Sequence, residues 1–227
     1  MERLQYRHEL KIEVSLFEYM ALKNRLDVIM HLDEHCGSDD MYSISSLYFD
    51  NVYDKALSEK LRGVDKREKF RLRYYDNDVG FIRLEKKQKS KGKCLKTSCV
   101  IDQSLVRGLI AGDYDELRKN EAPLVRELVF KMDTQGLRPR TIVNYNRRAY
   151  VYQPGNVRVT FDMNLTTGLD PSKFLTQSNQ LVDGDDQIII MEVKYDEFIP
   201  SFIADILNAK SGRVQAFSKY AQCRKYN

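Results

Sequence analysis

Long apolar runs are missing from this sequence of 227 residues. No stretch approaches the ~20 apolar residues that a membrane-spanning helix needs, so we expect no membrane segment in the chain. The chain begins Met-Glu-Arg-Leu-Gln-Tyr-Arg-His and lacks the apolar core of a signal peptide. We therefore expect a cytoplasmic protein.

Cysteine and histidine are too few and too scattered to suggest a zinc site. The cysteines are Cys36, Cys94, Cys99 and Cys223. None of them forms a C-x-x-C pair, and no histidine lies at ligand spacing from any of them. His8, His31 and His35 show no catalytic spacing either. Free thiols in a reducing compartment are the expectation.

Linkers, repeats and low-complexity tracts are also missing, so we expect a single domain over residues 1–227. A hydrophobic fraction of 42% and a charged fraction of 31% are typical of a soluble globular protein. The net charge of +4 is mild and does not by itself imply nucleic-acid binding. The placement of the basic residues is more informative than their excess.

Charged and apolar residues alternate in four separated stretches of the chain. These are Phe70–Tyr74, Arg83–Lys87, Val157–Asp162 and Met191–Tyr195. Successive side chains of a strand point to opposite faces, so Arg71 and Arg73 share a face. By the same rule Glu85 lies with Lys87, and Glu192 lies with Lys194. The opposite faces carry Phe70, Leu72, Tyr74, Val157, Val159, Phe161 and Val193.

Such strands have two interpretations. If helices cover the apolar faces, the charged faces line either open water or a polar cavity. A cavity ringed by arginine and lysine requires a polyanion to fill it, because charges taken out of water need partners. The residues alone leave both interpretations open.

Eight strands with helices between them are predicted. The strands are expected at residues 4–14, 42–50, 67–75, 80–89, 94–101, 140–152, 157–165 and 187–198. Helices are expected at residues 15–34, 51–61, 103–110 and 122–134, and in two segments after Pro200. The order is mostly that of an antiparallel meander. We expect an α+β fold in which eight antiparallel strands close into a barrel jacketed by helices.

Five motifs, in order along the chain, are those of a known family. They are Tyr6–Lys11, Ile44–Asn51, Lys69–Tyr75 with Leu84–Lys87, Tyr145–Tyr150 with Val157–Asp162, and Met191–Lys194 with Phe217–Tyr220. With these motifs the chain resembles the polyphosphate polymerase domain of the vacuolar transporter chaperone (VTC) family, within the triphosphate tunnel metalloenzyme superfamily. The resemblance covers nearly the whole chain.

This resemblance implies a tunnel of eight strands that threads a chain of phosphates. It implies a phosphotransferase that moves the terminal phosphate of ATP onto inorganic polyphosphate, with a divalent metal (Mn²⁺ or Mg²⁺). Family members often work beside membrane proteins, so a membrane-protein partner belongs to the expectation. We do not expect a nucleic-acid partner. Proteins that bind single strands place aromatic and basic residues on the same face, whereas here the aromatic residues lie on the face opposite the basic ones.

The resemblance also implies roles for individual residues. Phosphate groups of the nucleotide and product would be held by Arg71, Arg73, Lys87, Arg147 and Arg158, with Lys11 and Lys96 extending the ring and Lys194 neutralising the moving chain. Glu192 would bind the metal, with Glu85 and Glu9 assisting. Lys219 and Ser218 would approach the phosphate that is transferred, and Arg71 and Arg73 complete the catalytic set. Where yeast-type enzymes have a further lysine, this chain has Ala216, and Arg213 is a substitute one turn earlier.

Two other functions remain open. The first is a hydrolase of tripolyphosphate or nucleoside triphosphates on the same scaffold. Such relatives have a first strand of the form Glu-x-Glu-x-Lys, whereas this chain has Arg7, Glu9 and Lys11. The second is a non-catalytic polyphosphate-binding module, and the reason to consider it is that Ala216 replaces a family lysine. Tyr48, Phe49 and Asp50 are expected to be structural, as an aromatic packing element followed by a helix cap.

Overall fold

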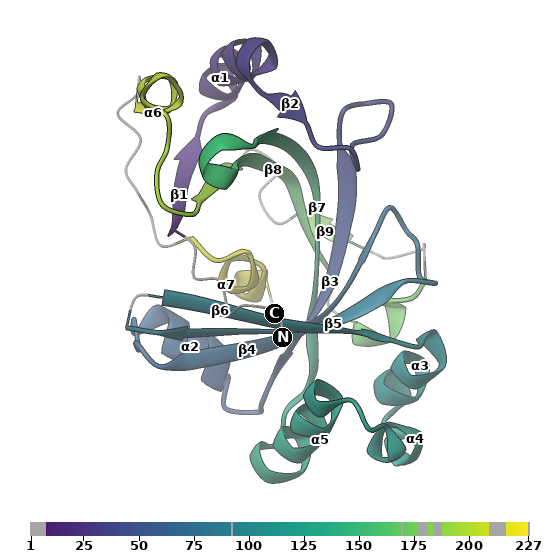
Figure 1. The fold of residues 1–227 in the computed structure, drawn as a ribbon. Coiled ribbons are helices and arrows are strands. Elements are labelled where there is room, and N and C mark those ends of the chain that lie inside the picture. Colours follow the sequence, from purple (N-terminus) through teal and green to yellow (C-terminus); the bar gives the residue numbers. More distant parts are fainter. Residues whose placement is uncertain are drawn as a thin grey trace. The chain divides into compact units, whose positions relative to one another are not determined.

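The computed structural model describes residues 8–91, 93–168, 170–176, 181–183, 188–208 and 217–226 (Figure 1). Its strands are β1 (His8–Val14), β2 (His31–Leu32), β3 (Tyr42–Asp50), β4 (Arg67–Tyr75), β5 (Ile82–Ser90), β6 (Lys93–Ile101), β7 (Arg138–Tyr152), β8 (Val157–Gly168), β9 (Leu181–Asp183) and β10 (Ile189–Tyr195). Its helices are α1 (Leu16–Ile29), α2 (Lys55–Leu61), α3 (Gln103–Ala111), α4 (Asp115–Lys119), α5 (Pro123–Gln135), α6 (Ser201–Asn208) and α7 (Lys219–Cys223).

The strands follow the hydrogen-bonded order β1-β10-β8-β7-β3-β4-β5-β6, with β2 beside β7 and β9 beside β8. Every strand pair whose register is described is antiparallel. The predicted α+β fold with an eight-stranded antiparallel sheet is therefore confirmed. In the part of the chain that the structure describes, no pairing joins the two end strands, β1 and β6.

Contacts divide the chain into two compact units. Unit 1 comprises Met1–Ser43, Tyr145–Leu165 and Asp183–Ser218. Unit 2 comprises Ile44–Asn144, Thr166–Val182 and Lys219–Asn227. Each unit has its own hydrophobic core. The expectation of one domain over residues 1–227 stays a prediction.

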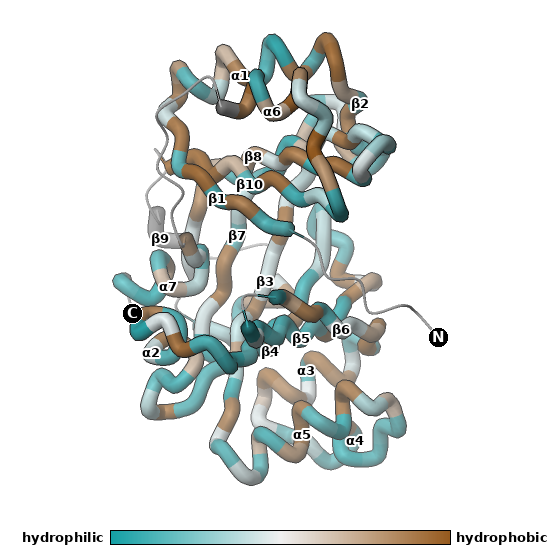
Figure 2. Tube along the Cα trace, turned by 60° about the vertical axis from the view of Figure 1, so that its left-hand side comes forward, coloured by the Kyte–Doolittle hydropathy of each residue, from teal (hydrophilic) through white to brown (hydrophobic). Residues whose placement is uncertain are grey.

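The core of unit 1 lies between its strands and helices α1 and α6, which run side by side (Figure 1). Apolar and polar residues alternate along β1 (Figure 2), and the apolar members face this core. Val159 and Phe161 of β8 are fully buried, as is Leu26 of α1. Helix α1 begins with a capping box, in which the Glu18 amide donates to Ser15 Oγ and the Ser15 amide donates to the Glu18 carboxylate.

The turn between β7 and β8 requires a glycine. Gly155 has φ = 73°, which side chains other than glycine rarely adopt. A Cβ atom at this position would collide with the carbonyl oxygen of Phe198. The Gly155 carbonyl in turn accepts a 3.1 Å hydrogen bond from the Asp196 amide. The turn is thus fixed against the segment that follows β10.

The core of unit 2 is built from one face of its strands and helices α3, α4 and α5, which lie beside one another (Figure 1). Leu72 of β4 and Leu84 of β5 are fully buried, as is Leu128 of α5. Lys86 of β5 lies on this face too, and its ammonium group contacts both carboxylate oxygens of Glu127 at 2.6 Å. Lys86 is the only charged residue on the side of β5 that faces the helices, and the ion pair with Glu127 offsets the cost of burying its charge.

The apolar faces predicted from alternation are confirmed, since all seven residues assigned to them are buried. Some boundaries differ from the prediction. Helix α1 ends at Ile29 because the chain enters the two-residue strand β2 at His31. The charged helix α4 and the short strands β2 and β9 were not predicted, since none is long enough to show a period.

Candidate functional site

The charged face of unit 2 consists of Lys69, Arg71, Arg73, Glu85, Lys87 and Lys96. Residues directly opposite one another on paired strands share a face of the sheet. Arg71 of β4 lies opposite Glu85 of β5. Lys87 lies opposite Lys69 on one side and opposite Lys96 on the other. The alternation in the sequence correctly predicted that Arg71 shares a face with Arg73, and Glu85 with Lys87.

Glu85 lies at the centre of this face and is only 2% exposed. Its carboxylate accepts a 2.7 Å hydrogen bond from Arg71 Nε and lies 3.9 Å from Arg73 Nη1. The Lys96 ammonium group contacts the other carboxylate oxygen. Burial alone would raise the pKa of Glu85, but these three cations hold it well below its usual range. Glu85 therefore stays ionised and neutralises part of the cationic face.

Tyr48 of β3 is a member of this site that the sequence analysis had assigned to packing. Its hydroxyl oxygen accepts a 2.9 Å hydrogen bond from Arg71 Nη1, and the Lys69 ammonium group lies 5.3 Å from the centre of its ring. Burial would raise the pKa of this phenol, yet the charges of Arg71, Lys69 and Arg73 lower it to about 7. Tyr48 thus carries a titratable proton in the middle of the cations.

The charged face of unit 1 is centred on Glu192 of β10, which is 5% exposed. Lys11 of β1 lies opposite Glu192, with 3.5 Å between the ammonium nitrogen and the carboxylate. The Lys194 ammonium group lies 3.1 Å from the same carboxylate, and Arg147 Nη2 lies 3.6 Å away. Arg158 of β8 lies opposite Lys194 in the register of β8 and β10, so it belongs to the same face. Five of the predicted site residues thus lie on one face.

Two further carboxylates, those of Asp162 and Glu9, neutralise part of the positive charge of this face. Asp162 of β8 is paired with Arg147 through hydrogen bonds of 2.6 and 2.8 Å, which form a forked arrangement. Glu9 lies 2.9 Å from the Lys11 ammonium group. Burial lowers the pKa of Lys11, but Glu192 and Glu9 raise it more, so that the net direction is upward.

Lys194 behaves differently from Lys11. Burial lowers its pKa to about 8; Glu192 opposes this shift, and the nearby charge of Arg147 adds to it. The charged form of Lys194 is therefore less strongly stabilised than that of Lys11. An anion placed on this face would raise the pKa of Lys194 again.

Arg158 is held by two residues that the sequence analysis did not assign. Its Nη1 lies 2.6 Å from the Asp33 carboxylate, and its Nη2 donates a 3.0 Å hydrogen bond to the Tyr42 hydroxyl group. Asp33 is 6% exposed and comes just after β2. The pairing depends on a two-residue strand, so the sequence carried no signal for it.

The surroundings of Glu192 include a further oxygen donor for a hard divalent cation. Thr160 lies directly opposite Glu192 in the register of β8 and β10. Its Oγ1 atom is buried and has no hydrogen-bond partner among the described residues. A carboxylate beside an unsatisfied hydroxyl group fits a hard cation whose remaining ligands come from phosphate oxygens and water. Across the described ranges, no cluster of three or more histidine, cysteine or acidic side chains could hold a metal by itself.

The other predicted catalytic residues, Ser218 and Lys219, lie at the start of helix α7. Lys219 is its first residue and Ser218 precedes it, and both are half-buried. The next residue, Tyr220, donates a 2.7 Å hydrogen bond to the Asp50 carboxylate. Its ring stacks on Tyr48 with 5.1 Å between centres. Asp50 also accepts hydrogen bonds from the Ala56 and Leu57 amides, so it caps α2 as predicted.

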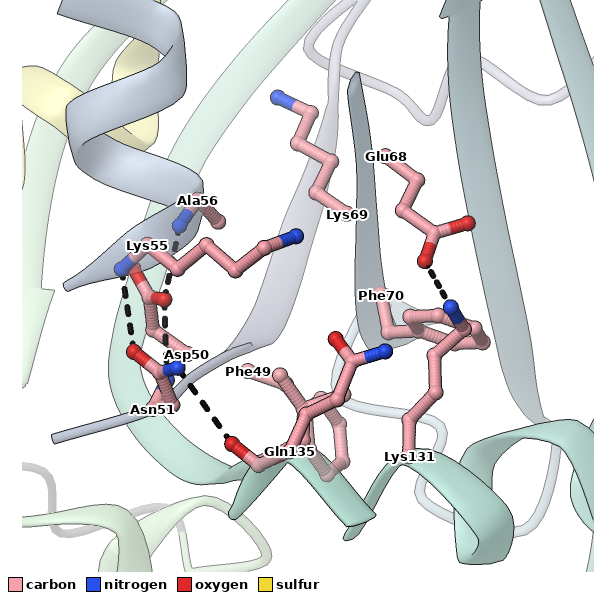
Figure 3. A pocket seen from close by; sticks show the side chains of 11 residues that line it. Phe49, Asp50, Asn51, Lys55, Ala56, Glu68, Lys69, Phe70, Lys131 and Gln135 are labelled. Atoms are coloured by element: carbon pink, nitrogen blue, oxygen red, sulfur yellow. Dashed lines mark hydrogen bonds and ion pairs between the residues drawn. The ribbon is translucent and has the colours of Figure 1, made fainter. Parts of the chain in front are cut away.

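A small pocket of unit 2 lies beside this cap (Figure 3). Its walls include Lys55 and the ion pair between Lys131 and Glu68. The Asn51 side chain spans it by donating to the Gln135 carbonyl oxygen. Its volume of about 20 Å³ has room for a water molecule and not for a phosphate group. This pocket joins α2 to the end of α5 and is not a candidate site.

The four cysteines are all free. Among the described helices, none is long and apolar enough to cross a bilayer. Tyr6, Arg7, Arg213 and Ala216 lie outside the described residues. The roles assigned to the basic residues, to Glu192, to Ser218 and to Lys219 stay predictions, although the structure groups most of them on the two charged faces.

Comparisons with known proteins agree with this geometry. Solved structures with a similar fold include a putative adenylyl cyclase from Hippeastrum, described as having a dominant triphosphatase activity (TM-score 0.62, 16% identity, 98% of this chain and 96% of that chain). A putative adenylate cyclase from Bacillus halodurans is also similar (TM-score 0.50, 13% identity, 90% and 87% coverage). No curated protein sequence matches significantly. The family model for the VTC domain matches residues 6–226, so the chain belongs to the VTC domain family, as its motifs had indicated.

Proposed function

We propose that this protein is a metal-dependent polyphosphate polymerase that transfers the terminal phosphate of ATP to inorganic polyphosphate and releases ADP. The observation that carries the proposal is the pair of charged faces, each with several cations gathered round one buried carboxylate. Membership of the VTC domain family supports it. The closed triphosphate tunnel that this family resemblance implies remains part of the proposal.

The transfer needs positioning and charge neutralisation more than covalent help from the protein. A terminal oxygen of the acceptor polyphosphate forms a bond to the γ-phosphorus of ATP while the bond from that phosphorus to the β-phosphate oxygen breaks. ADP leaves, and the acceptor is one phosphate longer. Arg71 and Arg73 would hold phosphate oxygens through their forked donors, and Lys219 with Ser218 would contact the phosphate that moves.

In unit 1, Lys11, Arg147, Arg158 and Lys194 would hold phosphates, as Lys87 and Lys96 would in unit 2. A divalent cation, when bound, neutralises phosphate charge and orients the reacting groups. Glu192 would hold it, and Thr160 Oγ1 supplies an unused oxygen close to that carboxylate. Lys11 and Lys194 contact Glu192 in this structure. When the cation binds the carboxylate in their place, they would be released to contact phosphate oxygens.

A hydrolase on the same scaffold is the second candidate. The Hippeastrum neighbour is described as a triphosphatase, and it has a similar fold. The first strand of this chain has Glu9 and Lys11 but an arginine, Arg7, where such hydrolases have a second glutamate. One carboxylate fewer means weaker metal and water activation, which favours transfer over hydrolysis.

Incubation of the purified protein with ATP, Mn²⁺ or Mg²⁺ and a short polyphosphate primer separates the candidates. Long chains on a gel with release of ADP are the expected result. ATP loss with orthophosphate as the only product would establish the hydrolase. Tight polyphosphate binding without turnover, in every metal tried, would establish the non-catalytic polyphosphate-binding module.

Two variants test the assigned residues. Glu192→Gln removes the carboxylate charge and should abolish metal-dependent turnover while the fold is kept. Arg71→Ala should weaken ATP binding. Arg118→Ala is the matched control, because it removes an exposed arginine that is paired with Asp133 at 2.8 Å. A Glu192→Gln protein with full activity would refute the metal assignment.

A further inference from the structure

A cavity of about 640 Å³ in unit 1 is lined by residues that, apart from Arg158, have no role in the function proposed above. It lies between the β2 segment and the turn that joins β7 to β8. Its walls include His31, Asp33, Glu34, His35, Tyr152 and Arg158. Small-molecule sites in proteins commonly have volumes of about 300–1,000 Å³, so this cavity is large enough for a ligand.

Arg158 belongs both to this cavity and to the charged face of unit 1. Its backbone lies opposite Lys194 on that face. Arg158 lines the cavity, and its guanidinium group is fixed by Asp33 and Tyr42 at 2.6 and 3.0 Å. One arginine therefore joins a surface suited to phosphate with a cavity of different chemistry.

The chemistry of the cavity disfavours phosphate and favours a neutral group. The carboxylates of Asp33 and Glu34 repel anions, and Asp33 is already paired with Arg158. The same carboxylates can accept hydrogen bonds from hydroxyl or amino groups. The rings of His31, His35 and Tyr152 provide flat surfaces on which a base can stack.

We infer that this cavity binds the nucleoside part of the nucleotide substrate, with Arg158 at the junction between ribose and phosphates. The inference rests on the proposed function and adds the part of the substrate that the charged faces do not explain. The consequence is a preference for nucleotides over inorganic polyphosphate of the same charge, since only a nucleotide has a base and a ribose to fill the cavity.

The test compares ADP, ATP and inorganic tripolyphosphate as ligands, by calorimetry in the absence of turnover. The double variant His31→Ala/His35→Ala removes two exposed rings and leaves Arg158 with its partners. Affinity for ADP and ATP should fall about tenfold, as expected for loss of stacking on one base, while affinity for tripolyphosphate stays within about twofold. His8→Ala, the third histidine, lies outside the cavity and should change none of the three.

Each other outcome has a clear meaning. An equal loss for nucleotides and tripolyphosphate would show that the cavity acts on phosphate and would overturn the inference. No loss for any ligand would overturn it as well. Wild-type protein that binds tripolyphosphate as tightly as ATP would refute the inference alone, whereas wild-type protein that binds neither would refute the proposed function too.

Discussion

The ionisation of Tyr48 leads to a quantitative prediction about phosphate binding. The pKa of this phenol lies at about 7, against an ordinary value of 10.0. The difference of about 3 pKa units corresponds to about 4 kcal/mol between the interactions of the phenolate and of the phenol. Arg71, Lys69 and Arg73 supply that stabilisation, and burial opposes it.

A phosphate chain bound on this face would use the same cations. Bound phosphate therefore raises the pKa of Tyr48 toward its ordinary value, and the phenolate takes up a proton on binding. Above pH 7 that proton uptake weakens binding by up to tenfold for each pH unit, or by up to about a hundredfold at pH 9. The stability of the free protein has the opposite pH dependence: the lowered pKa of Tyr48 adds to the free energy of unfolding, fully above pH 10, and this contribution is lost as the pH falls from 10 to 7.

The assay is the dissociation constant of tripolyphosphate between pH 6 and pH 9. Tyr48→Phe should bind with a shallower pH dependence than wild type and more tightly at pH 9. Tyr74→Phe is the matched control, because Tyr74 lies on the opposite face, burial raises its pKa, and its hydroxyl group donates to the Phe174 carbonyl at 2.8 Å. The ligand's own titration is common to all three proteins. Parallel curves for wild type and Tyr48→Phe would refute the reasoning.

Three further predictions concern the scaffold and can be measured by urea unfolding. Gly155→Ala should lower the free energy of unfolding by at least about 1 kcal/mol, because of the positive φ and the collision with the Phe198 carbonyl. Ser15→Ala should cost about 1 kcal/mol through loss of the α1 cap, and Ser15→Asp should restore it. Tyr220→Phe should cost about 2 kcal/mol, because the Asp50 carboxylate loses a charge-assisted hydrogen bond, and should also lower turnover by loosening α7. An unchanged turnover would separate α7 from catalysis.

The strands could be predicted because their alternation is sharp and their turns are marked. Asp76 and Asn77 both have positive φ in the β4–β5 hairpin, as their residue types indicate. Strand β2 could not be predicted, since two residues have no period. It nevertheless matters, because it leads into Asp33, which holds Arg158.

Membership of the charged faces could also be predicted, whereas the pairings within them could not. Alternation alone puts Arg71 with Arg73 and Glu192 with Lys194. The neighbouring residues Arg147 and Arg148 show the limit of this reasoning. Arg147 binds Asp162 on the charged face, and Arg148 contacts Asp27 and Asp40 instead. Such partners come from segments that are distant in sequence, so they follow from strand register and helix packing, which no local pattern specifies.

Glu85 provides the cationic strands of unit 2 with a resident anion. On the proposed function, an arriving phosphate would exchange with a carboxylate that is already in place, and that carboxylate would replace a departing phosphate. The net affinity is then the difference between two sets of ion pairs, so it stays moderate even where three cations converge. For the polymerase proposed above, a moderate affinity would let a long polyanion advance by one unit after each addition, whereas unneutralised arginines would retain it at its first point of contact.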